Sequence, residues 1–208
     1  MIRGVMMHRR AMLVVILLMA GSVVGGPVSA VGLVPAAPGP VAMPLDALPA
    51  LPDRFVKRLA KARAQFLEQA AAIILGYGTA QGVDPAGIEN FIASGRAAIR
   101  AREIARLLAG DLNNDGALDT GELAVLVANA AASKRGQLQL AHGSADADRD
   151  GTATANELRA FGQSKALDQI DEDEAADWRR FMLFDLDHNG RVMLAEVMEV
   201  ADGVRQGG

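Results

Sequence analysis

The stretch of sequence that decides the expected fold is Asp111-Leu112-Asn113-Asn114-Asp115-Gly116-Ala117-Leu118-Asp119-Thr120-Gly121-Glu122. Oxygen-bearing side chains stand at its positions 1, 3, 5, 9 and 12, with a glycine at 6 and an apolar residue at 8. A hard divalent cation such as Ca²⁺ takes about six to eight oxygen ligands at roughly 2.3–2.6 Å. A short loop must curl to supply them, and Gly116 allows the sharp turn because it has no Cβ. The spacing therefore indicates a loop that wraps around an ion.

The same pattern occurs twice more in the chain. The second copy is Asp146-Ala147-Asp148-Arg149-Asp150-Gly151-Thr152-Ala153-Thr154-Ala155-Asn156-Glu157, and the third is Asp185-Leu186-Asp187-His188-Asn189-Gly190-Arg191-Val192-Met193-Leu194-Ala195-Glu196. The first residues of the three loops are 35 and 39 residues apart. This repeat length leaves room for an exiting helix, a turn and an entering helix between successive loops.

These three loops resemble those of the EF-hand superfamily, in particular its calmodulin-like members with several hands in tandem. The resemblance covers about half of the chain, from residue 100 to residue 200. It implies an all-α fold of helix–loop–helix units with short β-bridges between loops. We place the hands at 99–133, 134–164 and 174–204.

The resemblance also implies the ligands of up to three calcium ions, with a backbone carbonyl at position 7 and a bidentate glutamate at position 12. The third loop departs from the pattern with Met193 at position 9, where water can replace the side chain. In the second loop Ala153 is a poor bridge residue at position 8. The implied ligands are Asp111, Asn113, Asp115, Ala117, Asp119 and Glu122; Asp146, Asp148, Asp150, Thr152, Thr154 and Glu157; and Asp185, Asp187, Asn189, Arg191 and Glu196.

The N-terminal segment 1–30 has the features of a secretory signal peptide. Basic residues precede an apolar run, and Val28-Ser29-Ala30 offers small residues before a cleavage point. The alternative is an uncleaved membrane anchor, but the run from Ala11 to Val24 is 14 residues, short of the roughly 20 that span a bilayer. We therefore expect a periplasmic or secreted bacterial protein with no stable membrane span after cleavage. Segment 31–53 is rich in proline and predicts an extended linker.

Residues 54–98 predict helices on either side of a break at Gly76–Gly87, with an interruption near Ser94-Gly95. Two interpretations stay open, a plain helical hairpin and a degenerate hand that pairs with the Asp111 loop. Counting Tyr77 as position 1 puts Gly82 at position 6, but no carboxylate stands at positions 1, 3 or 5. We expect no calcium there. The stretch 163–173 predicts a solvated linker and the start of a helix.

Composition excludes several classes of function. The chain has 21 basic and 25 acidic residues, and removal of Arg3, Arg9 and Arg10 with the signal leaves 18 against 25, a net charge of −7. With no basic patch, we expect no nucleic-acid partner. The absence of cysteine excludes disulfides and thiolate chemistry. His142 and His188 lack the neighbours of a catalytic base, so we expect no enzyme.

The sequence predicts a calcium-binding exported bacterial protein that acts as a sensor or buffer. The alternative is a calcium-stapled structural or interaction module of the cell envelope. Calcium is the expected partner, and a protein target would bind through an apolar helix surface that includes Met182 and Met198.

Overall fold

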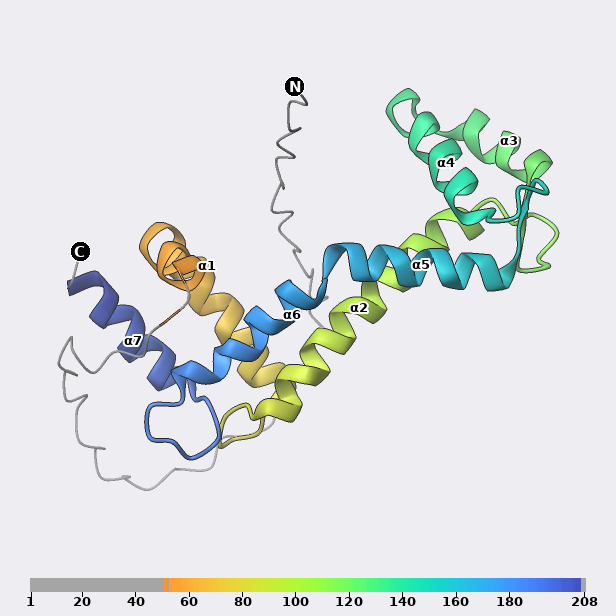
Figure 1. Cartoon of the computed structure of the whole chain (residues 1–208). Coiled ribbons are helices and arrows are strands. Elements are labelled where there is room, and N and C mark those ends of the chain that lie inside the picture. Colours follow the sequence, from red (N-terminus) through yellow and green to blue (C-terminus); the bar gives the residue numbers. More distant parts are fainter. Residues whose placement is uncertain (1–50, 52, 207–208) are drawn as a thin grey trace, which may run out of the picture. The chain divides into compact units, whose positions relative to one another are not determined.

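The chain folds mainly into helices in this computed structural model, which describes residue 51 and residues 53–206 (Figure 1). The expected all-α architecture is confirmed for that range. The predicted signal peptide and nearly all of the predicted linker lie outside it. The elements are α1 (Asp53–Tyr77), α2 (Pro85–Leu108), β1 (Leu118–Asp119), α3 (Thr120–Asn129), α4 (Ala132–Ala145), β2 (Thr152–Ala153), α5 (Ala155–Gln169), α6 (Glu172–Arg179), the 3-10 helix η2 (Arg180–Phe184) and α7 (Leu194–Gln206). None of the helices in this range combines the length and the apolar character needed to cross a membrane.

Short antiparallel bridges join the loops in pairs. Leu118 of β1 pairs with Ala153 of β2, so the Asp111 loop lies beside the Asp146 loop. Val83 pairs with Val192, with N···O distances of 3.0 and 2.8 Å, so the loop between α1 and α2 lies beside the Asp185 loop. One of the two interpretations left open by the sequence paired that first loop with the Asp111 loop, and this pairing is wrong. The pairs are nested, because the first loop meets the last and the two middle loops meet each other.

The loop between α1 and α2 is shorter than the other three. Val83 occupies the bridge position, and Asp84 caps α2 by accepting a hydrogen bond from the Gly87 amide at 2.9 Å. Asp119 caps α3 in the same way, accepting from the Glu122 amide at 2.8 Å. Gly87 therefore stands where the other loops have glutamate, and the register counted from Tyr77 is wrong by one residue. A Cβ on Gly87 would lie 2.5 Å from the Tyr77 carbonyl oxygen, so this position has no room for a side chain.

An aromatic core holds the first and last loops together. The rings of Phe55 and Phe66 from α1 lie 5.8 Å apart, and each lies 5.8 Å from the ring of Phe184. Phe181 lies 5.3 Å from Phe184, so η2 contributes two rings to the same cluster. The conformation of Ala62 is not helical and puts a kink into α1 between the two α1 rings. Aliphatic residues surround these rings, among them Leu59, Ile73, Ile74, Val83, Ile88, Ile92, Val192, Val197 and Val200.

A second, smaller core lies under the two middle loops. It is built from Leu107, Leu118, Ala141, Ala145, Ala153, Leu158 and Phe161. It contains one aromatic ring and three alanines, so it buries less apolar surface than the aromatic core. Ala153, a poor bridge residue by sequence, fits here because its small side chain is fully buried beside Leu118.

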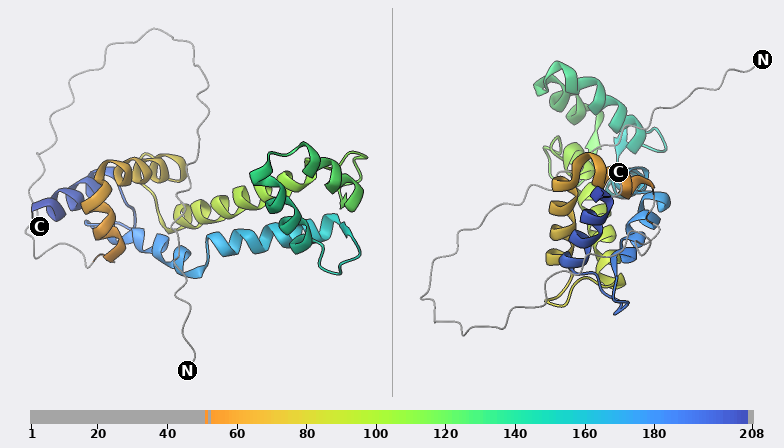
Figure 2. Two further views of the ribbon diagram at one scale, coloured as in Figure 1. Left: turned by 90° about the horizontal axis from the view of Figure 1, so that it is seen from above. Right: turned by 90° about the vertical axis from the view of Figure 1, so that its left-hand side faces the viewer.

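Helix α2 runs into both cores and packs along α5, which runs in the opposite direction; the two helices lie side by side in Figure 1 and in the left view of Figure 2. A Cβ on Gly162 of α5 would lie 2.9 Å from Ile104 and 3.0 Å from Arg100, so this glycine allows the close approach. The predicted interruption at Ser94-Gly95 is wrong, because α2 is continuous there. Gly95 instead makes space for Ile170, whose Cδ1 would lie 2.9 Å from an added Cβ.

Arg96 of α2 joins the point where α5 ends and α6 begins. Its Nε donates to the carbonyl oxygen of Ile170 at 2.9 Å, and its guanidinium pairs with Glu172 at 3.0 Å. The stretch 163–173, predicted to be a linker and the start of a helix, is mostly helix. Helix α5 continues to Gln169, Ile170 and Asp171 form the linker, and α6 begins at Glu172. The side chain of Asp171 caps α6 by accepting from the Glu174 amide at 2.8 Å.

The aromatic core predicts the effect of one substitution on stability. We expect Phe184→Ala to lower the free energy of unfolding by about 3–5 kcal/mol, because Phe184 is fully buried and three rings would lose contacts to a cavity. Urea denaturation followed by Trp178 fluorescence in metal-free buffer measures this change.

The neighbouring Leu183→Ala is the matched control. Leu183 is 38% exposed, so the free energy of unfolding should change by no more than about 0.5 kcal/mol. Equal losses in the two variants would contradict the assignment of Phe184 to the centre of the core.

Candidate metal centres

The three acidic loops share an unusual backbone conformation. The residue at position 4 has a positive φ in each: 61° at Asn114, 63° at Arg149 and 57° at His188. The glycines at position 6 also have a positive φ, between 80° and 95°. The left-handed conformation turns the chain sharply, and it is costly for residues that have a Cβ. Three loops of different sequence thus adopt the same curled conformation.

Carboxylates at position 1 hold this curl by accepting backbone hydrogen bonds from position 6. Asp111 Oδ2 accepts from the Gly116 amide at 2.9 Å, Asp146 Oδ2 from Gly151 at 3.0 Å and Asp185 Oδ2 from Gly190 at 2.9 Å. Side chains at position 5 accept in turn from the amide of position 7 in every loop. The oxygens are thereby drawn toward the inside of each turn.

The glutamate at position 12 closes each loop. Glu122 accepts from the amides of Leu112 at 2.9 Å and Asp119 at 3.2 Å, at the two ends of its loop. Glu157 and Glu196 make the equivalent pairs of hydrogen bonds. Asp119 and Thr154 also cap the following helices in reciprocal capping boxes with these glutamates. The glutamate therefore links the loop to the first turn of the exiting helix.

The pKa of Glu157 lies well below its ordinary range. A hydrogen bond from the Thr154 hydroxyl at 2.7 Å and backbone hydrogen bonds from Thr154 and Ala147 stabilise the ionised form. They lower its pKa from 4.5 to about 2. The carboxylate is therefore fully charged at neutral pH and available to a cation.

Two of the three loops bring three carboxylates close enough to hold a metal ion. Oxygens of Asp146, Asp148 and Glu157 lie within 4.8 Å of one another, and so do those of Asp185, Asp187 and Glu196. Within residues 53–206, the carboxylates of the Asp111 loop do not form a third such group. That loop has Asn113 at position 3, and its amide donates to Asp115 at 2.9 Å.

The Asp146 loop contains an unsatisfied oxygen. Asp146 is only 8% exposed, and its Oδ1 is buried with no hydrogen-bond partner in the described part of the chain. The equivalent oxygens differ, because Asp111 Oδ1 accepts from the Asp115 amide at 3.2 Å and Asp185 Oδ1 from the Asn189 amide at 3.1 Å. A buried, unpartnered carboxylate oxygen is costly unless a cation compensates it. The donor set of this loop, all hard oxygens, fits such a cation.

The Asp185 loop has its own pattern of charge. Asn189 donates to Asp187 at 2.8 Å, which partly satisfies that carboxylate. Arg191 extends from position 7 to the neighbouring loop, where it meets Thr79 Oγ1 at 3.3 Å and Asp84 at 3.5 Å. Arg191 therefore ties the Asp185 loop, which has a group of three carboxylates, to the loop between α1 and α2, whose charged contact with it is the single carboxylate of Asp84. Met193 at position 9 is 40% exposed.

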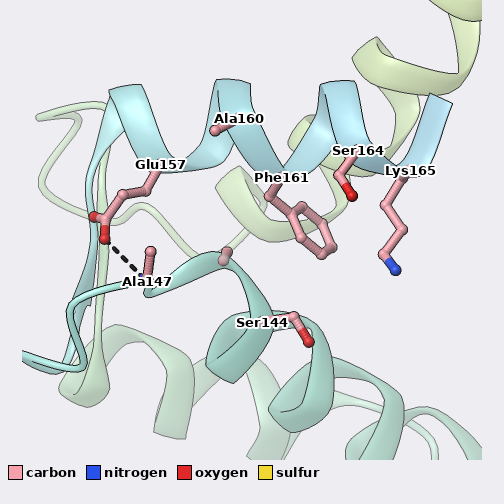
Figure 3. A pocket seen from close by; sticks show the side chains of 8 residues that line it. Ser144, Ala147, Glu157, Ala160, Phe161, Ser164 and Lys165 are labelled. Carbon is pink, nitrogen blue, oxygen red and sulfur yellow. Dashed lines mark hydrogen bonds between the residues drawn. The ribbon is translucent and has the colours of Figure 1, made fainter. Parts of the chain in front are cut away.

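A shallow cavity of about 220 Å³ borders the Asp146 loop, between α4 and α5. Figure 3 shows Glu157 at one end, hydrogen-bonded to Ala147, with Phe161 and Lys165 farther along α5. The Lys165 ammonium lies 5.6 Å from the centre of the Phe161 ring. The cavity is open and mostly apolar, and Glu157 is the only carboxylate among the residues that line it.

One residue near the loops was missed as a contributor to the site. His142 is 5% exposed, and its Nε2 lies 2.9 Å from the carbonyl oxygen of Leu118, the bridge residue of the Asp111 loop. Its place four residues before Asp146, on the face of α4 that carries Leu138 and Ala145, gave a periodic signal for burial. Nothing in the sequence pointed to Leu118 as its partner.

No protein-family model matches the chain, and no curated protein or solved structure is significantly similar to it.

The hydrogen bond between Thr154 and Glu157 predicts a pH-dependent property of the metal-free protein. In Thr154→Val the pKa of Glu157 should rise from about 2 but stay below 4.5, because the hydroxyl is lost while the backbone donors remain. The ionised Glu157 stabilises the fold fully above pH 4.5, and this contribution is lost as the pH falls toward 2. NMR titration of the Glu157 side-chain carboxyl measures the shift.

Thr152→Val provides the control, since it makes the same change of hydroxyl to methyl at a side chain that does not contact Glu157. Its Glu157 pKa should remain near 2. An unchanged pKa in Thr154→Val would refute the role of the hydroxyl.

Proposed function

We propose that this chain is an EF-hand protein that binds calcium through its three acidic loops. The observation that carries the proposal is the buried Asp146 Oδ1, which has no partner among the described residues and lies beside two further carboxylates. The repeated curl of the loops and their bridges in pairs support it, because calcium needs a flexible cage of many oxygens.

The ligands would come from the same positions in each loop. Side chains at positions 1, 3, 5 and 12 and the carbonyl at position 7 would bind the ion in all three. Position 9 offers Asp119 in the first loop and Thr154 in the second, whereas Met193 leaves it to water in the third. The Asp146 loop has the strongest demand for a cation, because it has aspartates at both positions 3 and 5. In each of the other loops an asparagine at one of these positions donates its side-chain amide to the aspartate at the other.

The proposed role is that of a non-enzymatic sensor or buffer outside the cytoplasm. The predicted signal peptide supports export to the periplasm or the medium. A structural role is the alternative: in a calcium-rich setting, sites of about 10⁻⁴–10⁻³ M stay filled and staple the fold. The nested pairing is compatible with both roles, because ion binding to the native state stabilises it by mass action in either case.

One feature favours a sensor with a protein target. Helix α3 is rich in apolar residues, yet Glu122 is its only buried residue. Val125 of α3 is 44% exposed and Leu140 of α4 is 74% exposed. If these side chains belong to one contiguous apolar surface, that surface would suit the binding of a partner. The proposed target is accordingly a protein segment with an apolar face.

Calcium uptake by the mature protein, stripped with a chelator, is the direct test. We expect isothermal calorimetry to detect up to three ions, and Glu157→Gln to weaken one site on the order of a hundredfold. Loss of a direct ligand should have an effect at least at the upper end of the tenfold to hundredfold range that is typical of outer-shell partners. Absence of uptake at millimolar calcium would refute the proposal.

Trp178 reports on the last loop separately. It is 6% exposed and belongs to the aromatic core, which also holds Val192 of the Asp185 loop. The centres of the Trp178 and Phe91 rings lie 5.0 Å apart. We expect its emission to respond to calcium, and Glu196→Gln to abolish that response at sub-millimolar calcium.

Glu122→Gln is the matched control, because it changes the same residue type at the same position of a loop in the smaller core. It should retain the Trp178 response. Loss of the response in Glu122→Gln and its retention in Glu196→Gln would contradict the assignment of Trp178 to the last loop.

A hydrophobic dye separates the sensor from the staple. If calcium exposes apolar surface, dye emission should rise severalfold on calcium addition and fall again with chelator, and Leu140→Ser should reduce the rise. An unchanged emission with calorimetrically filled sites would support the structural role instead.

A further inference from the structure

A buried histidine lies between the two middle loops and contacts both. His142 of α4 is 5% exposed, and its backbone carbonyl accepts from the Asp146 amide at 2.8 Å. Its side-chain Nε2 lies 2.9 Å from the carbonyl oxygen of Leu118. One residue therefore touches position 1 of the Asp146 loop and position 8 of the Asp111 loop.

The chemistry of the second contact fixes the direction of the hydrogen bond. A carbonyl oxygen can only accept, so Nε2 carries the proton and donates it to Leu118. Both groups are buried, and a buried polar group that loses its partner is costly, so each holds the other in place. Leu118 stands between Ala117 and Asp119, which are both proposed ligands. The imidazole therefore fixes the backbone on which those two ligands are placed.

The two loops differ in how well they are satisfied without an ion. In the Asp111 loop, both carboxylate oxygens of the first residue accept backbone hydrogen bonds. In the Asp146 loop, Oδ1 of the first residue is buried and accepts none from the described residues. Asp146 is the C-cap of α4, the helix that carries His142. An ion bound by the Asp146 side chain would therefore fix the end of the helix that positions the imidazole.

We propose that His142 is a positioning residue that couples the two loops, so that an ion in the Asp146 loop raises the affinity of the Asp111 loop. This inference rests on the proposed function. Coupling between two sites is reciprocal, so it can be measured from either loop. Its expected size is about 5–150-fold in affinity.

The test is a set of calcium titrations by calorimetry on the mature full-length chain with Glu196→Gln, which silences the last loop. The affinity of the Asp111 loop is measured with the Asp146 loop intact and with that loop silenced by Glu157→Gln. The ratio of the two affinities is the coupling. We expect His142→Leu to reduce this ratio at least about fivefold and His142→Gln, which keeps a donor, to retain most of it.

Leu138→Ala is the matched control for packing. Leu138 is buried on the same face of α4, so its truncation loosens the helix without removing the donor to Leu118. Retained coupling in Leu138→Ala and lost coupling in His142→Leu would support the proposal. Unchanged coupling in His142→Leu, equal loss in Leu138→Ala, or no coupling in the parent chain would overturn it. Absence of calcium uptake in every variant would instead refute the proposed function itself.

Discussion

A tight turn between two helices leaves several backbone N–H groups without partners, and in this chain the carboxylates of the turn accept them. The aspartate at position 1 accepts a hydrogen bond from the amide of position 6, and the glutamate at position 12 accepts from amides at both ends of the loop. Because unpaired amides are costly, these carboxylates stabilise the loop conformation. The same oxygens face the inside of the turn, so the groups that shape the loop are also the groups that could hold an ion.

The nested pairing makes α2 common to both pairs of loops. Ile88 and Ile92 at its beginning lie in the aromatic core, and Leu107 near its end lies in the smaller core. The chain that packs against α2 is divided into α5 and α6, which Ile170 and Asp171 separate. Arg96 of α2 contacts this junction. Each loop pair therefore has its own core. The two cores are connected by the continuous helix α2 and by α5 and α6, whose junction Arg96 holds.

The two pairs also differ in how they are held. The pair formed by the first and last loops combines a large aromatic core with one group of three carboxylates, and Arg191 of the last loop forms an ion pair with Asp84 of the first loop. The middle pair has a thin core rich in alanine but two acidic loops. Since less apolar burial leaves less stability in reserve, the middle pair depends more on polar contacts such as that of His142 with Leu118.

Local structure followed from the order of the residues: the twelve-residue spacing, the glycines and the capping residues predicted helices joined by three curled acidic loops. These features involve hydrogen bonds between residues at most ten positions apart, so a short stretch contains both partners. Contacts between distant segments set which loops pair, that α2 continues through Gly95, and that His142 meets Leu118. Val83 and Val192 meet across more than half of the chain, and that choice depends on how much apolar surface the whole fold buries, which no single stretch encodes.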